Sequence, residues 1–327
     1  MDTSKFLYDC NLFEFGDLMA FEKTEWIWHN GKIVKWDEAK TSVATWSLHY
    51  GVSFFEGIRA YWNGTQLNVV RLKEHIKRMF NSAKIYDVTI PYTPEELEAA
   101  VIETLKKNNM KTTTYIRPIV YFGEMKALGL HPGQTPVNVA IFVLPFGRYL
   151  GPDALEKGIK VAISSWRKIP SFCLPQEAKC GANYANSYLT ALEAAKGGYE
   201  EALLLDHRGF ICEGPGENFF MIKNGELHTA PKNASILDGI TRDCLIRIAK
   251  DENILVVERD LTRGEAYAAD EAFFTGTAGE VTPITSIDGR VVGNGKAGEM
   301  TKKLQAVYFD AVNGKNPKYK KWITPVY

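Results

Sequence analysis

Apolar and polar positions follow clear periods in the first part of the chain. Residues 26–36 (WIWHNGKIVKW) have Asn30-Gly31 between two alternating arms, which is typical of a β-hairpin. Residues 69–86 repeat apolar side chains every three to four positions, so they predict a helix with one buried face. Residues 93–109 begin with Thr-Pro and run from acidic to basic residues, which predicts a second helix. The buried face of the first helix is expected to carry Leu72, Ile76, Met79 and Ala83.

Two apolar strands and then a break follow these helices. Residues 114–123 (TYIRPIVYFG) and 137–147 (VNVAIFVLPFG) read as strands, and the second is so continuously apolar that we expect both of its faces to be buried. Residues 144–153 (LPFGRYLGPD) then combine prolines and glycines, which is typical of a connection. We therefore predict an N-terminal domain over residues 1–145, a linker over 146–155 and a C-terminal domain over 156–327.

The second domain is predicted to be richer in strands. Turns at residues 206–209 and at Asn224-Gly225 each separate two apolar arms, so both regions read as hairpins. Residues 241–253 follow an Asp-Gly pair and have a helical pattern, and residues 270–284 predict a strand that runs into a Gly/Thr turn. The chain is therefore expected to have an α+β fold with two domains.

Composition and charge exclude several classes of protein. The chain has 327 residues and 45% hydrophobic residues, which fits a folded protein of two domains. Lys+Arg and Asp+Glu both number 39, so the net charge favours neither nucleic acid nor a membrane as a partner. The first 18 residues lack an apolar core and are not expected to be a secretion signal. The odd number of cysteines, without a CxxC pair, predicts no metal site and a reducing, cytoplasmic location.

One lysine stands among small and apolar residues. Lys179 lies in PQEAKCGANYANSYLTALEAAKGGY, residues 175–199, with alanines and glycines beside it. An isolated lysine is usually a solvated surface charge, and its neighbours alone do not overturn that interpretation. The alternative is an amine that loses its proton and reacts.

Other parts of the chain supply groups that would suit such an amine. Glu213 and Glu217 flank a Gly-Pro-Gly turn, which is either a solvated turn or a carboxylate aimed into a cavity. LDGITRD (237–243) begins a helix and TGTAGE (275–280) is a Gly/Thr turn, so both can direct backbone N–H groups at an anion. Arg78 lies away from the apolar helix face and could reach a phosphate. A reactive lysine, a carboxylate and a phosphate seat together indicate pyridoxal 5'-phosphate.

Seven segments resemble the branched-chain amino acid aminotransferases, which are class IV aminotransferases of pyridoxal-phosphate fold type IV. They occur in the order of that family over most of the chain from about residue 26 onward. The segments are LHYGVSFFEGIRAY (48–61), RLKEHIKRMFNSAKIY (71–86), YIRPIVYFG (115–123), EAKCGANYANSYLTALEA (177–194), GFICEGPGENFFMIKNGEL (209–227), LDGITRDCLIRIAK (237–250) and ADEAFFTGTAGEVTPI (269–284). The resemblance implies a smaller N-terminal α/β domain and a larger, strand-rich C-terminal domain with a pseudo-barrel, which binds the cofactor. It gives no account of the first twenty residues or of the C-terminal tail.

The resemblance implies a role for several residues around the cofactor. Lys179 matches the catalytic lysine that binds it as a Schiff base and moves the proton. Tyr184 matches the tyrosine at its phenolic oxygen, and Glu213 the carboxylate at its pyridine nitrogen. The remaining cofactor-binding positions, mostly around the phosphate, are Arg78, Gly216, Ile240, Thr241, Gly276 and Thr277.

The resemblance also implies a substrate pocket. Thr277 and Ala278 match the N–H groups that bind the α-carboxylate, and Arg117, with Tyr50 and Tyr149, matches the group for the distal carboxylate of glutamate. Leu130 matches a residue that closes the pocket of the neighbouring subunit, which implies a homodimer or a higher oligomer. The remaining substrate-binding positions are Phe55, Gly57, Arg59 and Phe146.

The expected activity is transfer of the amino group of L-leucine, L-isoleucine or L-valine to 2-oxoglutarate by a ping-pong mechanism. Two departures bear on the choice of side chain: Phe146 replaces a common Trp, and the loop over residues 123–132 is one residue longer than usual. D-amino acid aminotransferase and aminodeoxychorismate lyase are alternatives within the same fold. A non-catalytic α/β binding module is a remote alternative, since no GxGxxG connects a strand to a helix.

Overall fold

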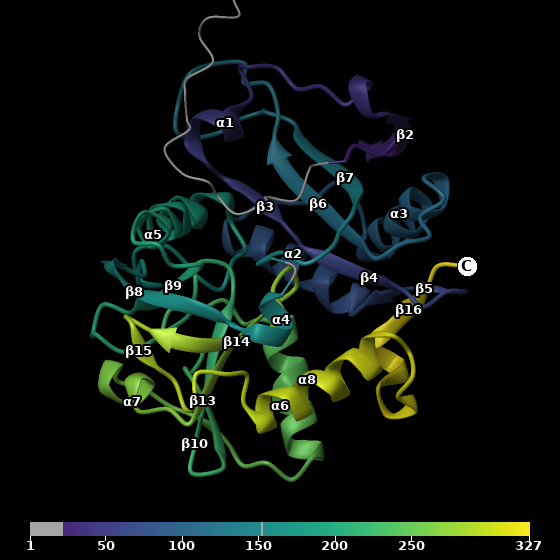
Figure 1. Cartoon of the computed structure of the whole chain (residues 1–327). Helices are drawn as coiled ribbons and strands as arrows, with labels where there is room; N and C mark the ends of the chain where they lie inside the picture. Colours follow the sequence, from purple (N-terminus) through teal and green to yellow (C-terminus); the bar gives the residue numbers. More distant parts are fainter. Residues whose placement is uncertain (1–21, 152) are drawn as a thin grey trace, which may run out of the picture.

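The computed structural model describes residues 22–151 and 153–327. Two eight-stranded sheets organise the chain, one above the other in Figure 1. The first sheet has the order β16-β5-β4-β6-β7-β1-β2, with β3 paired to β6. Its strands are β1 (Trp26–His29), β2 (Lys32–Lys35), β3 (Ser53–Phe55), β4 (Ile58–Trp62), β5 (Leu67–Val70), β6 (Thr114–Phe122), β7 (Val137–Pro145) and β16 (Ile323–Pro325).

The second sheet has the order β12-β11-β10-β13-β14-β8-β9, with β15 paired to β14. Its strands are β8 (Ile159–Arg167), β9 (Glu201–Leu205), β10 (Asn218–Lys223), β11 (Glu226–Thr229), β12 (Val256–Glu258), β13 (Glu271–Gly276), β14 (Glu280–Ile287) and β15 (Arg290–Val291). The helices are α1 (Trp46–Tyr50), α2 (Leu72–Ile85), α3 (Pro94–Lys107), α4 (Ala154–Lys157), α5 (Tyr184–Lys196), α6 (Ile240–Asp251), α7 (Arg263–Tyr267) and α8 (Glu299–Val312).

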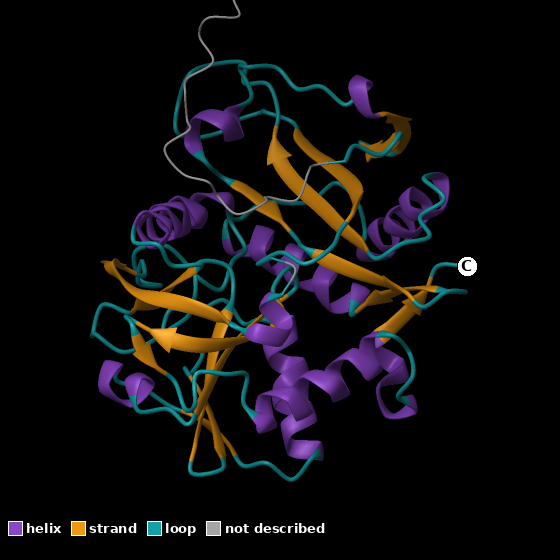
Figure 2. Ribbon diagram, in the orientation of Figure 1, coloured by secondary structure: helices purple, strands orange, loops and turns teal. Residues whose placement is uncertain are grey.

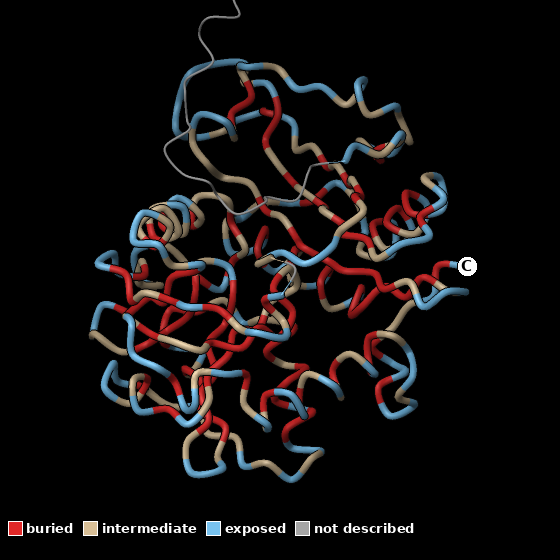
Figure 3. The backbone as a smooth tube through the Cα atoms, viewed as in Figure 1, coloured by how far each residue is buried: buried red, intermediate tan, exposed pale blue. Residues whose placement is uncertain are grey.

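Helices cover both sheets. Helix α3 packs on β1 and β7, and α2 packs on α3 and β3. In the second sheet, α5 covers β8 and β9, whereas α6 and α8 lie against β13 (Figure 2). Burial is concentrated in the central strands and the helix faces that touch them, as Figure 3 shows. The predicted α+β class with two domains is confirmed.

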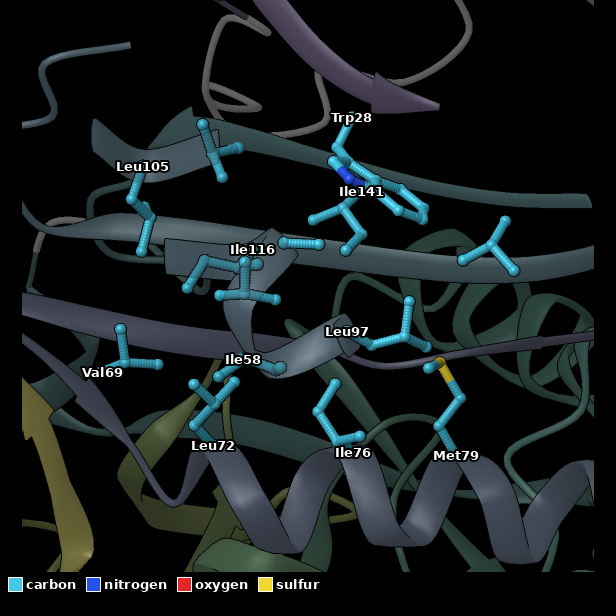
Figure 4. Packing of buried hydrophobic residues seen from close by; sticks show 14 of the residues in the cluster. Trp28, Ile58, Val69, Leu72, Ile76, Met79, Leu97, Leu105, Ile116 and Ile141 are labelled. Carbon is cyan, nitrogen blue, oxygen red and sulfur yellow. The ribbon is translucent and has the colours of Figure 1, made fainter. Parts of the chain in front are cut away.

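The helix predicted over residues 69–86 begins at Leu72, because residues 69 and 70 belong to β5. Its apolar stripe is buried as expected, with Leu72, Ile76, Met79 and Ala83 each at most 2% exposed. Figure 4 shows three of these side chains pointing from α2 toward residues of the sheet. The second helix, α3, is also confirmed. The side chain of its N-cap, Thr93, accepts the N–H of Glu96, and the Glu96 carboxylate accepts the N–H of Thr93.

The hairpins follow their turn residues. Asn30-Gly31 and Asn224-Gly225 all have positive φ angles, which the tight turns β1–β2 and β10–β11 require. The hairpin expected at residues 206–209 is only partly regular. Asp206 closes the turn by accepting two backbone N–H groups, but Ile211 pairs through isolated bridges and does not form a full strand.

The expectation that the strand at residues 137–147 is buried on both faces was wrong. In β7, Val139, Ile141 and Val143 are fully buried, whereas Asn138, Ala140 and Phe142 between them are half-exposed. One face lies on α3 and the core, and the other contributes Phe142 to a cavity.

The C-terminal residues cross from the second half of the chain to the first. Strand β16 pairs antiparallel with β5, although residues 156–327 were predicted as the second domain. The Tyr319 hydroxyl donates to Asp251 of α6 at 2.8 Å, and the Arg71 N–H donates to the carbonyl of Trp322 at 2.6 Å. The tail therefore connects α6 to the start of α2. The domain limits remain a prediction, and residues 1–21 and Pro152 lie outside the described residues.

Candidate active site

Lys179 lies in the connection between β8 and α5, at the wall of a cavity of about 330 Å³. Its backbone N–H donates to the Ser82 hydroxyl at 2.9 Å, and its carbonyl accepts the Phe55 N–H at 3.2 Å. These two bonds attach the segment around Lys179 to helix α2 and to strand β3 of the first sheet. The Lys179 amine, Nζ, donates to the Tyr184 hydroxyl at 2.5 Å, and Tyr184 is the first residue of α5.

The surroundings of Lys179 favour a neutral amine. Enclosure by protein atoms, followed by the charge of Arg78, lowers its pKa from 10.5 to about 8. Burial raises the pKa of Tyr184 to about 12, so its phenol stays protonated. A neutral amine beside a hydroxyl group is the arrangement that a nucleophilic lysine requires.

A second lysine in the cavity wall, Lys168, is buried and has the opposite character. Lys168 Nζ lies 2.6 Å from Glu213 Oε1. Burial alone would lower the pKa of Lys168, but Glu213 outweighs it and the pKa is raised. Lys168 therefore stays charged and holds Glu213, while Lys179 is the amine free to react.

Glu213 and Glu217, paired in the sequence analysis, have different surroundings. Glu213 Oε2 accepts hydrogen bonds from Asn218 Nδ2 at 3.0 Å and from the Leu237 N–H at 3.1 Å. With Lys168, these donors surround a carboxylate. Burial raises the pKa of Glu217 to about 7. Among the described residues, the only hydrogen bond that its carboxylate accepts comes from the Gly216 N–H. Of the two, Glu213 is thus the one built to carry a negative charge.

Hydrogen-bond donors from three segments line the cavity. Arg78 on α2, the first residues of α6 and the turn after β13 all line it. Helix α6 begins at Ile240, and its N-cap, Gly239, has no side chain to cap it, so the first N–H groups of the helix lack a capping acceptor. A Cβ at Gly239 would lie 1.9 Å from Asn218 Oδ1, which explains the need for glycine there. The cavity therefore has the donors that a phosphate group needs.

A second group of lining residues is apolar and surrounds one cation, Arg117. Arg117 Nη2 donates to the Tyr115 hydroxyl at 2.7 Å, and its guanidinium lies 4.6 Å from the centre of the Phe55 ring. A Cβ at Gly57 would lie 2.3 Å from the same Tyr115 hydroxyl, so glycine leaves room for that side chain. Phe142, Leu144 and Phe146 complete the apolar wall.

The structure brings most of the predicted site residues to this cavity. Those that line it are Phe55, Gly57, Arg78, Arg117, Phe146, Tyr149, Lys179, Tyr184, Glu213, Gly216, Ile240, Thr241, Gly276, Thr277 and Ala278. Tyr50 and Leu130 lie outside the cavity of their own chain, and Leu130 is 81% exposed.

Arg59, predicted to bind substrate, lies behind the turn that follows β13. Its Nη1 donates to the carbonyl of Ala278 at 3.1 Å and to that of Thr277 at 3.4 Å, and its Nη2 to that of Gly147 at 2.7 Å. In a trans peptide unit the carbonyl of one residue and the N–H of the next point in opposite directions. Because Arg59 binds the Thr277 carbonyl, the Ala278 N–H points away from Arg59. Arg59 thereby fixes the turn and does not line the cavity.

Sequence reasoning missed Lys168, Asn218, Glu56 and Tyr115. Lys168 directly follows strand β8, and Glu56 is a lone carboxylate within the apolar run SFFEGI. A single charge inside an apolar strand pattern is a usable signal, because such a charge is buried only with a partner.

Comparison with known proteins agrees with this geometry. The family model "Amino-transferase class IV" matches residues 53–287. A probable branched-chain-amino-acid aminotransferase of Aquifex aeolicus is 46% identical over 91% of this chain and 95% of its own length. The crystal structure of the Escherichia coli branched-chain amino acid aminotransferase is 42% identical, with a TM-score of 0.91 over 93% of this chain and 100% of that one.

A second similar structure was solved in its PLP-form. It is the branched-chain amino acid aminotransferase from Thermobaculum terrenum, with 34% identity and a TM-score of 0.88 over 94% of this chain and 99% of that one. The chain belongs to the class IV aminotransferases and, within them, to the branched-chain amino acid aminotransferases. The family and the enzyme class expected from the sequence are thus confirmed.

Proposed function

We propose that this aminotransferase moves the amino group of L-leucine, L-isoleucine or L-valine to 2-oxoglutarate, with pyridoxal 5'-phosphate bound to Lys179. The observation that carries the proposal is the pair of lysines in the cavity wall: the surroundings of Lys179 lower its pKa to about 8, and Lys168 is paired with Glu213. Hydrogen-bond donors and apolar side chains line the same cavity.

The residues present fit the cofactor. Arg78, the N–H groups of Ile240 and Thr241 and the side chain of Thr277 would hold its phosphate, and Glu213 would face its pyridine nitrogen. Tyr184, already bonded to the Lys179 amine, would bond its phenolic oxygen. When bound, pyridoxal 5'-phosphate supplies a ring that accepts the electron pair left behind when the α-proton leaves.

The side chains of the chain perform the remaining tasks. The freed Lys179 amine takes the α-proton and returns it, as a base whose pKa lies near neutral pH should. Glu213 keeps its charge through Lys168 and Asn218. The N–H groups at Thr277 and Ala278 would hold the α-carboxylate, and Arg117 the distal carboxylate of glutamate. Because aliphatic and acidic substrates use the cavity in turn, the reaction is ping-pong.

The half-reactions of the purified holoenzyme test this function. Addition of L-leucine should convert the cofactor to its aminated form and bleach the violet absorption band, and 2-oxoglutarate should restore it. Bleaching by D-alanine but not by L-leucine would assign the chain to the D-amino acid aminotransferase subclass. Absence of a band after addition of the cofactor would contradict the enzyme itself and favour a binding module.

The lowered pKa of Lys179 predicts a pH dependence. With a pKa of about 8 instead of 10.5, about one amine in four is neutral at pH 7.5 instead of about one in a thousand. Raising the pH removes the proton, so the rate of cofactor uptake by the cofactor-free enzyme should rise with pH through a midpoint near pH 8 and level off about one pH unit higher. Stopped-flow absorbance measures this rate. A midpoint near 10.5 would show that the cavity does not neutralise the amine.

Substitution of Arg117 should separate the two substrates. Arg117→Met removes the charge-assisted hydrogen bonds to a distal carboxylate, so KM for 2-oxoglutarate should rise about ten- to a hundredfold. KM for L-leucine should change by less than about threefold, since its side chain carries no charge. Steady-state kinetics with each substrate varied provides the comparison. Equal losses for both substrates would contradict the assignment of Arg117.

The proposal includes a homodimer and a cytoplasmic location. The apolar side chains of Val43, Leu48, Leu128 and Leu130 are 66% exposed or more, and such a surface is typical of a subunit interface. Cys173, Cys180, Cys212 and Cys244 are free thiols, which suits a reducing compartment. Among the described helices none is long and apolar enough to cross a membrane.

A further inference from the structure

A fully buried carboxylate lies directly behind Arg78. Glu56 is 0% exposed and stands between two residues of the cavity wall, Phe55 and Gly57. Arg78 Nε donates to Glu56 Oε1 at 2.7 Å, and Arg78 Nη2 donates to Glu56 Oε2 at 2.8 Å. Two parallel bonds between a guanidinium and a carboxylate fix the plane of the guanidinium as well as its position.

His75, one turn before Arg78 on α2, provides a third donor. Its Nδ1 lies 2.7 Å from Glu56 Oε2. Burial alone would raise the pKa of Glu56, but Arg78 and His75 outweigh it and lower the pKa to about 2. The ionised carboxylate can only accept, so Nδ1 carries the proton and donates it. The Glu56 backbone is also fixed, because its N–H donates to the Pro118 carbonyl at 2.9 Å.

This arrangement leaves part of Arg78 for the cavity. A guanidinium has five N–H groups. Two donate to Glu56, and Nη1 donates to the Asp238 carbonyl at 3.0 Å. One N–H of Nη1 and one of Nη2 remain for another acceptor, and Arg78 lines the cavity together with the first residues of α6. The direction of these two N–H groups is set by Glu56.

The same turn of α2 also holds the backbone of Lys179. The Ser82 hydroxyl donates to the Arg78 carbonyl at 2.9 Å and accepts the Lys179 N–H at 2.9 Å. Buried ion pairs seldom stabilise a fold more than apolar side chains of the same volume. The value of this one therefore lies in orientation.

We propose that Glu56 is a positioning residue that orients Arg78 toward the phosphate group of the cofactor. The inference rests on the proposed function. If Glu56 acts through Arg78, its loss weakens the binding of cofactors that carry a phosphate and spares those that lack it. If Glu56 only holds α2 in place, its loss weakens both equally.

The test compares pyridoxal 5'-phosphate with pyridoxal, which lacks the phosphate, by absorbance titration of cofactor-free protein. Glu56→Gln keeps the volume and removes the charge. The Kd for pyridoxal 5'-phosphate should rise about ten- to a hundredfold, while the Kd for pyridoxal should stay within about twofold. Equal losses for both compounds, or no loss, would overturn the inference.

A double-mutant cycle shows whether Glu56 acts through Arg78. In an Arg78→Met background, Glu56→Gln should not raise the Kd for pyridoxal 5'-phosphate any further. If Glu56→Gln raises this Kd as much in that background as in the wild-type protein, the inference is overturned. Asp206→Asn is the matched control. Asp206 is also a buried carboxylate, with Arg208 Nη2 2.8 Å away, but it does not line the cavity. It should not change the ratio of the two Kd values.

Two further results keep the outcomes distinct. If Glu56→Gln does not fold, Glu56→Asp keeps the charge but shortens the reach, and an unchanged ratio of the two Kd values would overturn the inference. If the wild-type protein binds neither compound through Lys179, the proposed function itself fails. If it binds pyridoxal 5'-phosphate and Glu56→Gln binds it equally well, only the role of Glu56 fails.

Discussion

Lys179→Ala should abolish transamination and the violet absorption band while the fold survives. The substitution removes both the amine that binds the cofactor and the base that moves the α-proton, so kcat should fall by at least about 10⁴-fold. Lys179 contributes its backbone, not its side chain, to the bonds with Ser82 and Phe55, and alanine preserves both. Steady-state kinetics, the absorption spectrum and thermal unfolding measure the three expectations.

Two controls sharpen this experiment. Lys196→Ala changes an exposed lysine at the end of α5, the helix that follows Lys179 in the chain, and should leave turnover unchanged. A small primary amine such as methylamine can enter the space left by the Lys179 side chain, so it should restore part of the activity of Lys179→Ala. Normal turnover in Lys179→Ala would refute the assignment, and so would full loss of activity in Lys196→Ala.

Periodicity and turn chemistry predicted the local elements well because their causes lie within a few residues. The stripe from Leu72 to Ala83 and the Thr93 cap are decided by neighbours along the chain. The positive φ angles at Asn30 and Gly31 are likewise local. The same reasoning misjudged β7, since the number of faces that other elements cover is a property of the whole fold.

The charged residues of the site show where sequence reasoning ends. Lys179 was identified from the candidate groups elsewhere in the sequence and from the family resemblance, and most of the residues predicted with it line the cavity. Lys168 and Glu56 were not identified, because the role of each depends on a partner that is distant in the sequence. Lys168 pairs with Glu213, 45 positions away, and Glu56 pairs with Arg78, 22 positions away. The apolar run around Glu56 indicates that its charge is buried, but it does not say which residue pairs with that charge. The position of Arg59 could not be predicted either, because packing decides whether its side chain lies on the cavity side of the turn after β13 or behind it.

Glu213→Gln should slow the chemical step far more than it weakens binding. Glutamine keeps the size of the side chain but removes the charge that would hold the pyridine nitrogen protonated. That charge matters most when the α-proton leaves, so kcat should fall about 10²–10³-fold with KM within a few-fold. Presteady-state measurement of the leucine half-reaction isolates this step. An unchanged rate would contradict the role of Glu213.

The ion pair with Lys168 allows the chemical role of Glu213 to be separated from a structural one. Glu213→Gln leaves the buried Lys168 cation without its carboxylate, which should destabilise the protein by about 3 kcal/mol. The double variant Glu213→Gln/Lys168→Met removes that unpaired cation, so thermal stability should largely return. The slow chemical step should remain, because the charge at the pyridine nitrogen is still missing. Recovery of kcat together with stability would show that Glu213 serves the fold and not the reaction.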